Sequence, residues 1–303
     1  ILFNKGKTMK KYDTGDLRNL AIVGHGASGK TTLVEAMLAL GKEINRMGTI
    51  ETGSTVSDYH PGEKERQISI HSTPLHMEWD QKKFNIIDAP GYSDFIGESI
   101  SSLAVVDMAA VIIHGVNGIE VGTETMWSTS TELGIPKVLV VNGLDREHTK
   151  FNDILNQAKE RFGKNVFPMQ LPVNAGPGFN QIVDVLRREL ITYQVDSSGK
   201  FSEDELPEDL VSEVDGLHSE LIEYVAESDD SLLEKYFDQK VTTVVNNSYE
   251  LAKNYVDEMR NKIEAEIVLI AFDTNKSYRF LNDNTNEYLR FLRTQKLIRG
   301  VDE

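Results

Sequence analysis

The segment 24–31 has the residue types and spacing of a phosphate-binding loop. Its sequence, GHGASGKT, matches G-x-x-x-x-G-K-[ST] at every fixed position. Glycines let main-chain N–H groups converge on phosphate oxygens, and the start of a helix adds positive potential there. Lys30 can then bridge the β- and γ-phosphates of a nucleotide, and the Thr31 hydroxyl can ligate Mg²⁺. The nucleotide-binding residues predicted from this segment are Gly24, His25, Gly26, Ala27, Ser28, Gly29, Lys30, Thr31 and Thr32.

A second chemical group follows further along the chain. Asp88 ends an apolar run and begins the sequence Asp-Ala-Pro-Gly, which lies 64 residues after the start of the loop. A carboxylate at a strand end can hold Mg²⁺ through water, and Gly91 allows a main-chain N–H to approach the γ-phosphate. Ser69 lies between the two motifs and offers a further hydroxyl for a closing loop. The predicted magnesium ligands are therefore Thr31, Ser69 and Asp88.

The third motif is Asn142-Gly143-Leu144-Asp145, at the end of another apolar run. An aspartate in this place can accept two hydrogen bonds from the N1–H and N2–H₂ edge of guanine. Adenine cannot supply that pair of donors. The motif predicts that Asn142 and Asp145 bind nucleotide and that the base is guanine.

The elements that must position these residues alternate along the chain. Short apolar runs predict strands, and amphipathic stretches predict helices between them. This alternation predicts an α/β fold with a mostly parallel sheet and helices on both faces, whose site lies at the carboxyl ends of the strands. The predicted strands are residues 20–23, 68–77, 84–88, 109–116, 137–142 and 166–171, and the predicted helices are 30–40, 94–106, 123–133 and 152–162.

The pattern changes after residue 171, which suggests a second part of the chain. Turn-forming residues occur at 175–179 and 196–199. Helices are predicted at 208–226, 231–237 and 286–297, and a strand at 267–272. The predicted organisation is an N-terminal extension (1–15), a nucleotide-binding core (16–174), an acidic insertion (175–240) and a C-terminal remainder of the core (241–303).

Composition excludes several classes of function. The 303 residues carry a formal charge of −16 and no cysteine, so disulfides and thiolate chemistry are impossible. No apolar stretch is long enough to cross a membrane, and the N-terminus lacks a secretory signal pattern, so a cytoplasmic protein is expected. Residues 196–238 include fifteen acidic residues and only two lysines, which gives this segment a local charge of −13. Such a segment opposes DNA binding and suits a basic partner surface, although a solvated helical face explains it as well.

The order and spacing of these motifs resemble the translational GTPases, specifically elongation factor G. The sequence from Asp88 to Phe95, DAPGYSDF, is most similar to a divergent second class of that family. The resemblance covers about residues 16–238 and implies a P-loop GTPase fold that hydrolyses GTP with Mg²⁺ at the ribosome. It implies catalytic roles for Lys30, Gly91 and Tyr92, and places Ser69 where the family has a magnesium-binding threonine. It also implies that the acidic insertion contacts the ribosomal stalk protein.

The chain departs from the family pattern in four places. Tyr92 stands where the main class has a water-orienting histidine, and Gly143 stands where the family has a lysine that packs on the base. The Ser-Ala element expected after the last strand is not recognisable at residues 273–276. The four later domains of the family are not found in these residues.

Three functions remain open at this point. The first is GTP hydrolysis. The second is a GTP-binding interaction module with little hydrolytic activity, which Tyr92 and Gly143 would favour. The third is an ATP-using P-loop kinase or ATPase, against which Asp145 argues.

Overall fold

The computed structural model describes residues 10–163, 166–195 and 199–227. The elements expected at 231–237, 267–272 and 286–297, and the segment 273–276, lie outside the described residues. The chain divides into two compact units, residues 1–221 and 222–303. The first unit contains the predicted site residues.

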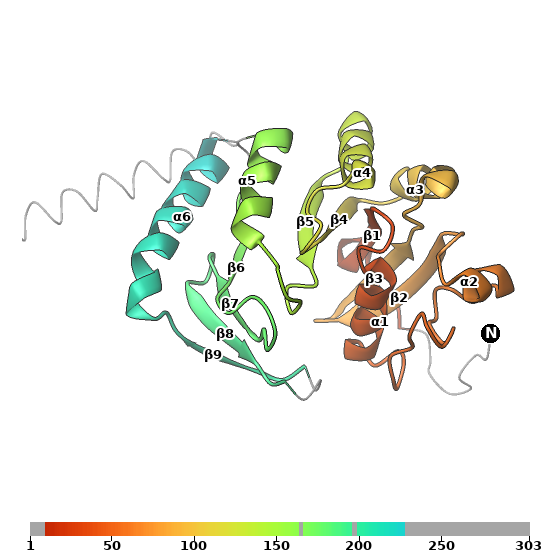
Figure 1. Ribbon diagram of the computed structural model, residues 1–303, viewed down its shortest axis with the longest axis horizontal. Coiled ribbons are helices and arrows are strands. Elements are labelled where there is room, and N and C mark those ends of the chain that lie inside the picture. The colour runs from red at the N-terminus through yellow and green to blue at the C-terminus, as the bar shows by residue number, and fades with distance from the viewer. Residues whose placement is uncertain (1–9, 164–165, 196–198, 228–303) are drawn as a thin grey trace, which may run out of the picture. The chain divides into compact units, whose positions relative to one another are not determined.

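A five-stranded sheet forms the centre of the first unit, in the order β2-β3-β1-β4-β5 (Figure 1). The strands are β1 (Leu17–Gly24), β2 (Thr73–Trp79), β3 (Lys82–Asp88), β4 (Met108–His114) and β5 (Lys137–Asn142). β1 pairs in parallel with β3 and β4, and β4 pairs in parallel with β5, whereas β2 and β3 are antiparallel. The carboxyl ends of four strands therefore meet at one edge, which confirms the predicted fold class.

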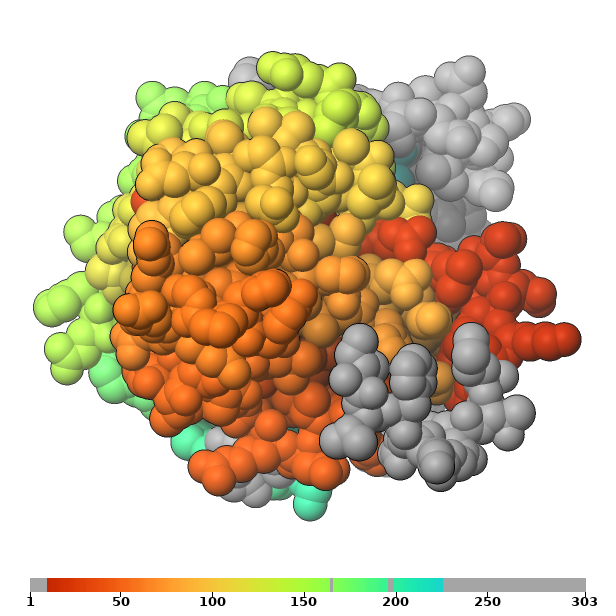
Figure 2. All heavy atoms as spheres, turned by 90° about the vertical axis from the view of Figure 1, so that its right-hand side faces the viewer, coloured from red at the N-terminus to blue at the C-terminus, as the bar shows by residue number. Residues whose placement is uncertain are grey.

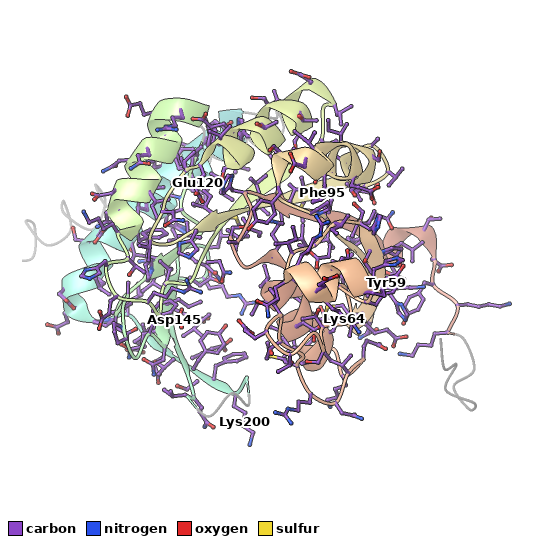
Figure 3. All side chains as sticks on the ribbon, turned by 45° about the vertical axis from the view of Figure 1, so that its right-hand side comes forward. Tyr59, Lys64, Phe95, Glu120, Asp145 and Lys200 are labelled. Atoms are coloured by element: carbon purple, nitrogen blue, oxygen red, sulfur yellow. The ribbon has the colours of Figure 1, made fainter. Side chains whose placement is uncertain are left out.

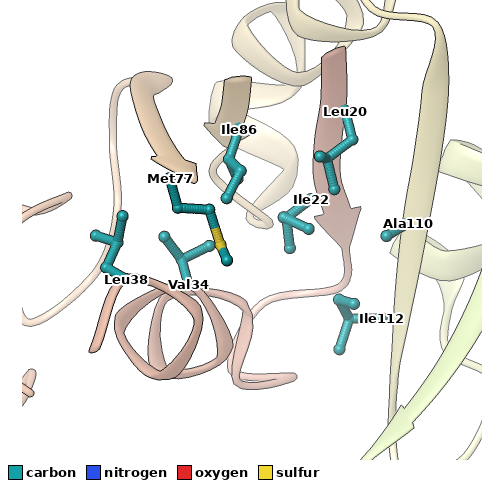
Figure 4. Packing of buried hydrophobic residues seen from close by; sticks show 8 residues of the cluster. All are labelled: Leu20, Ile22, Val34, Leu38, Met77, Ile86, Ala110 and Ile112. Atoms are coloured by element: carbon teal, nitrogen blue, oxygen red, sulfur yellow. The ribbon is translucent and has the colours of Figure 1, made fainter. Parts of the chain in front are cut away.

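Helices cover both faces of this sheet. The α-helices of the described chain are α1 (Lys30–Leu40), α2 (Pro61–Arg66), α3 (Ile96–Leu103), α4 (Val121–Glu132), α5 (Phe151–Phe162) and α6 (Glu208–Glu227). Neighbouring residues of a strand point to opposite faces. Ile22 of β1 accordingly packs with Val34 of α1 (Figure 4), while Ala21 packs with Leu103 of α3 and Met126 of α4. Burial on both faces explains why β1 and β4 are apolar without alternation.

A second, antiparallel sheet follows, in the order β6-β7-β8-β9. Its strands are β6 (Gln170–Pro172), β7 (Gln181–Asp184), β8 (Glu189–Tyr193) and β9 (Phe201–Glu205). Val183 and Leu190 of this sheet form a small core with Val214 of α6. The turn predicted at 175–179 joins β6 to β7, with Phe179 N–H donating to the Gly176 carbonyl at 2.9 Å.

Two predicted strands are corrected by the structure. The run 166–171 does not join the parallel sheet, because only its end enters β6, which pairs antiparallel with β7. The strand predicted at 68–77 begins only at Thr73, since main-chain N–H groups before it bind glutamate side chains instead of a neighbouring strand. It then continues to Trp79 and pairs with β3.

The helix pattern also differs from expectation in detail. The helix predicted at 94–106 is a short 3-10 turn, Ser93–Phe95, followed by α3. α2 was not predicted. It is six residues long, and a capping box between His60 and Glu63 stabilises its start, with Pro61 in its first turn.

Candidate functional site

The loop 24–29 joins β1 to α1 and wraps its main chain around the start of that helix. Ala27 and Gly29 adopt left-handed conformations, with φ of 59° and 86°. A Cβ atom at Gly29 would lie 2.3 Å from the Asn142 side-chain nitrogen, so another residue would displace Asn142 and would also be strained at this φ. The Ser28 hydroxyl donates to the His25 carbonyl at 2.9 Å. These contacts stabilise a loop whose amides precede a helix N-terminus, as a phosphate site requires.

The Lys30 ammonium group is buried against this loop. It donates to the carbonyl oxygens of His25 at 2.7 Å and Gly24 at 3.3 Å. Burial lowers its pKa to about 8, although the carboxylates of Asp88 and Asp58 favour the charged form. The negative charge of a bound polyphosphate would stabilise the charged form of the buried lysine and so raise its pKa.

The three predicted magnesium ligands come together at this edge of the sheet. The hydroxyls of Thr31 and Ser69 lie 3.2 Å apart. Asp88 is 1 % exposed, and neither of its carboxylate oxygens has a hydrogen-bond partner among the described residues. Burial raises its pKa to about 6. The Ser57 and Thr31 hydroxyls, which lie near the carboxylate without the geometry of a hydrogen bond, and the Lys30 charge oppose that rise.

These donors fit a divalent cation. A buried carboxylate without a hydrogen-bond partner is costly unless a positive charge neutralises it. Mg²⁺ prefers such oxygen ligands and takes few from the protein when it is bound with phosphate. No group of three or more histidine, aspartate or glutamate side chains in the described part of the chain is arranged to hold a metal ion. The hydroxyls of Thr31 and Ser69 together with the Asp88 carboxylate are oxygen ligands of the kind that suits a nucleotide-bound magnesium ion.

Asp58 is a further acidic residue at this site, and sequence reasoning missed it. It is 4 % exposed, and burial raises its pKa while a hydrogen bond from Ser69 lowers it. Its charge also acts on Lys30. No motif distinguishes Asp58 from other aspartates in polar segments, and only the folding of the segment 41–72 brings it here.

Gly91 and Tyr92 approach the loop from the end of β3. A Cβ atom at Gly91 would lie 2.3 Å from Lys30 Nζ, so the Gly91 main chain passes directly beside the ammonium group. A Cβ at Gly26 would lie 3.0 Å from ring atoms of Tyr92, which places the ring against the loop. The Tyr92 side chain is nevertheless 42 % exposed and in reach of solvent. The predicted catalytic residues Lys30, Gly91 and Tyr92 are thus neighbours.

Asn142 ties the third motif to the loop. Its side-chain amide donates to the Ser28 carbonyl at 3.0 Å. Asp145 is exposed in the turn after β5 (Figure 3). Thr32 is exposed on α1. His25 turns its side chain to α4, and its Nδ1 accepts the Gly122 N–H at 3.2 Å.

Gly143 adopts φ of 75°, a conformation that other residues enter only with strain. Sequence alone predicts that Gly143→Lys tightens GTP binding by restoring a stem over the base. The space for a Cβ exists, since the nearest atom, Arg146 Nε, would lie 3.5 Å away. The backbone conformation nevertheless disfavours lysine, so strain offsets part of any gain.

Fold and site together define a P-loop nucleotide-binding domain of the GTPase type. The chain matches the family described as the Elongation factor Tu GTP binding domain over residues 15–254, and it belongs to that family of translational GTPases.

Two relatives give the extent of the likeness. Elongation factor G of Salinibacter ruber is 36% identical over 234 residues, which cover 77% of this chain and 33% of that protein. A crystal structure from Thermus thermophilus is similar with a TM-score of 0.68 and 32% identity, over 73% of this chain and 33% of that one. The chain thus spans about a third of the length of the relatives it matches. In the described residues, no helix is long and apolar enough to cross a membrane.

Proposed function

We propose that this chain binds GTP with Mg²⁺ and hydrolyses it to GDP and phosphate, as an elongation factor G-like domain acting at the ribosome. The observation that carries the proposal is the assembly of Lys30, Thr31 and the unpartnered Asp88 carboxylate at the start of α1. Family membership supports the same chemistry. The likeness to the divergent second class of elongation factor G rests on the sequence from Asp88 to Phe95.

Each group has a role that follows from its chemistry. The loop amides and Lys30 would bind the β- and γ-phosphates and stabilise negative charge on the transferring group. Thr31, Ser69 and Asp88 would hold Mg²⁺, directly or through water, and Asp58 lies beside them. When bound, that ion supplies charge neutralisation at the phosphates. Asp145 would read the guanine edge, and Tyr92 would orient the attacking water.

Binding measurements with purified protein test the proposal. Isotherms for GTP, GDP and ATP, each with and without Mg²⁺, should show magnesium-dependent preference for guanine nucleotides. Lys30→Ala should abolish binding of both guanine nucleotides, while Lys64→Ala, an exposed lysine of α2, should leave it unchanged. Equal affinity for ATP and GTP would overturn the assignment.

A second candidate function is a GTP-binding interaction module with little hydrolysis. Tyr92 favours it, because the phenol near the loop is a poor proton acceptor at neutral pH. A single-turnover hydrolysis rate separates the two functions.

The proposed partner is the ribosomal stalk protein, docked on the acidic segment around β9 and α6. All five residues of β9 are exposed, and three of them are acidic. The proposed place of action is the cytoplasm, where the related translation factor works. Sequence-specific DNA binding is not expected of a surface with this charge.

A further inference from the structure

The segment 41–72, between α1 and β2, is held by buried carboxylates. Apart from α2, it contains no helix or strand. In Figure 2 this segment lies within the orange area that covers much of the face in view. Irregular backbone leaves N–H groups without partners from regular structure, so other acceptors must bind them.

Glu63 of α2 supplies three of these acceptor contacts. Its Oε1 accepts the N–H groups of Ile70 and His71, both at 3.0 Å, and its Oε2 accepts the N–H of His60 at 3.1 Å. The residue is only 1 % exposed. A carboxylate is tolerated at such depth because several N–H donors stabilise its charge.

The contacts of Glu63 hold the main chain next to Ser69. Ser69 directly precedes the two residues that Glu63 binds, and its hydroxyl is 3.2 Å from that of Thr31. Glu35 of α1 holds the earlier half of the segment, accepting the N–H groups of Gly48 at 2.7 Å and Val56 at 2.6 Å. Glu63 is thus the buried carboxylate that binds the main chain directly after Ser69, whereas the Ser69 hydroxyl also hydrogen-bonds the Asp58 carboxylate.

We propose that Glu63 is a positioning residue for the magnesium-bound triphosphate, because it keeps the Ser69 hydroxyl beside Thr31. The inference rests on the proposed function, which assigns both hydroxyls to Mg²⁺. Glu63 touches neither the nucleotide nor the ion and acts through the main chain at residues 70 and 71. Residues that orient metal ligands change metal affinity by about 10- to 100-fold when removed.

The test compares Glu63→Gln with Glu65→Gln. Glutamine keeps the size of residue 63 but replaces one acceptor oxygen with an N–H₂ donor. Glu65 lies two residues further along the same helix and is exposed. Its substitution therefore removes the same charge without disturbing the hydrogen bonds that Glu63 accepts. In the nucleotide-free protein, amide hydrogen exchange at Ile70 and His71 should accelerate at least about tenfold in Glu63→Gln and stay unchanged in Glu65→Gln.

Nucleotide binding gives the second measurement. The magnesium concentration that half-saturates GTP binding should rise by about tenfold in Glu63→Gln. GDP binding should change less than twofold, because Thr31 and the loop remain. In a Ser69→Ala background, Glu63→Gln should add less than twofold, since the residue it positions is already gone.

The outcomes separate the inference from the proposed function. Unchanged exchange at Ile70 and His71, or faster exchange with unaltered magnesium dependence, would overturn the role of Glu63. An additive effect in the Ser69→Ala background would do the same, because a general loss of structure acts independently of Ser69. Absence of magnesium-dependent GTP binding in the unsubstituted protein would instead overturn the proposed function, while the exchange rates would still decide whether Glu63 holds the segment.

Discussion

The hydroxyl oxygens of Thr31 and Ser69 lie 3.2 Å apart, although 38 residues separate them in the chain. One belongs to the first turn of α1 and the other to the irregular segment before β2. A ligand that binds both groups would couple the phosphate-binding loop to that segment. Under the proposed function, a bound triphosphate would be such a ligand.

Removing the Ser69 hydroxyl should show how much it contributes to magnesium-dependent GTP binding. Ser69→Ala is expected to weaken magnesium-dependent GTP binding by about tenfold, roughly 1.4 kcal/mol, because one oxygen ligand is lost. Ser69→Thr should retain binding, since it keeps the hydroxyl. Titration calorimetry at fixed Mg²⁺ measures the difference. Equal affinities for all three proteins would show that Ser69 is not a ligand.

Asp88 should make stability depend on pH in a defined direction. Its folded-state pKa of about 6 lies above the ordinary value of 3.8, so the folded protein binds the extra proton between these values. The metal-free protein should therefore lose stability as pH rises from about 4 to 6, by up to about 3 kcal/mol from this group. Urea unfolding in EDTA measures this as the difference between the unsubstituted protein and Asp88→Asn.

The substitution Asp88→Asn should raise the stability of the protein and weaken its binding of GTP. At pH 7, Asp88→Asn is expected to stabilise the metal-free protein by about 1–3 kcal/mol, because it removes a buried charge. It should also weaken magnesium-dependent GTP binding. A less stable Asp88→Asn protein at pH 7 would contradict the view that this carboxylate is unpaired.

Asp145 should determine the choice of base. Asp145→Ala is expected to cost about 1.5 to 3 kcal/mol in GTP affinity, roughly 10- to 100-fold, by removing two charge-assisted hydrogen bonds. Glu147→Ala is the matched control, since Glu147 is exposed in the same turn. Competition between GTP and ATP checks the result, and an equal loss in both variants would point to general charge instead of base recognition.

Tyr92 should orient water without acting as a base. Tyr92→Phe keeps the ring against Gly26 and removes only the hydroxyl. Single-turnover GTP hydrolysis is expected to fall by at least about tenfold, or about 1.4 kcal/mol, with GTP affinity nearly unchanged. The rate should also lack an inflection near pH 6.5, which a catalytic histidine would give. An unchanged rate would assign water orientation to another group, such as the Gly91 main chain.

The acidic surface should bind a basic partner in a salt-dependent manner. Replacing the exposed Glu213 and Glu220 of α6 with glutamine should weaken association with ribosomal stalk protein and reduce its dependence on salt. Surface charges are screened over about 8 Å at physiological salt, so association should slow as salt rises. Association rates measured at several salt concentrations test this. Salt-independent association would contradict the proposal that these acidic residues attract the partner.

The amino-acid sequence by itself determined the phosphate-binding loop and the ends of the parallel strands. The glycines, Lys30 and Thr31 lie within eight consecutive residues, and their geometry follows from local strand, turn and helix preferences. The same holds for Asp88 and Asn142, because residues that end parallel strands meet at one edge of the sheet.

Only the tertiary structure decided which other groups join them. Asp58 and Glu63 lie in the segment 41–72, where the sequence points to Ser69 but to neither carboxylate. Their burial depends on how that segment folds, with Glu63 bound to the N–H groups of Ile70 and His71 and Asp58 bound to Ser69. The contact of Tyr92 with Gly26 likewise joins segments far apart in sequence. Such contacts depend on burial and hydrogen bonding between segments that only the folded domain brings together. A local pattern of residues does not encode them.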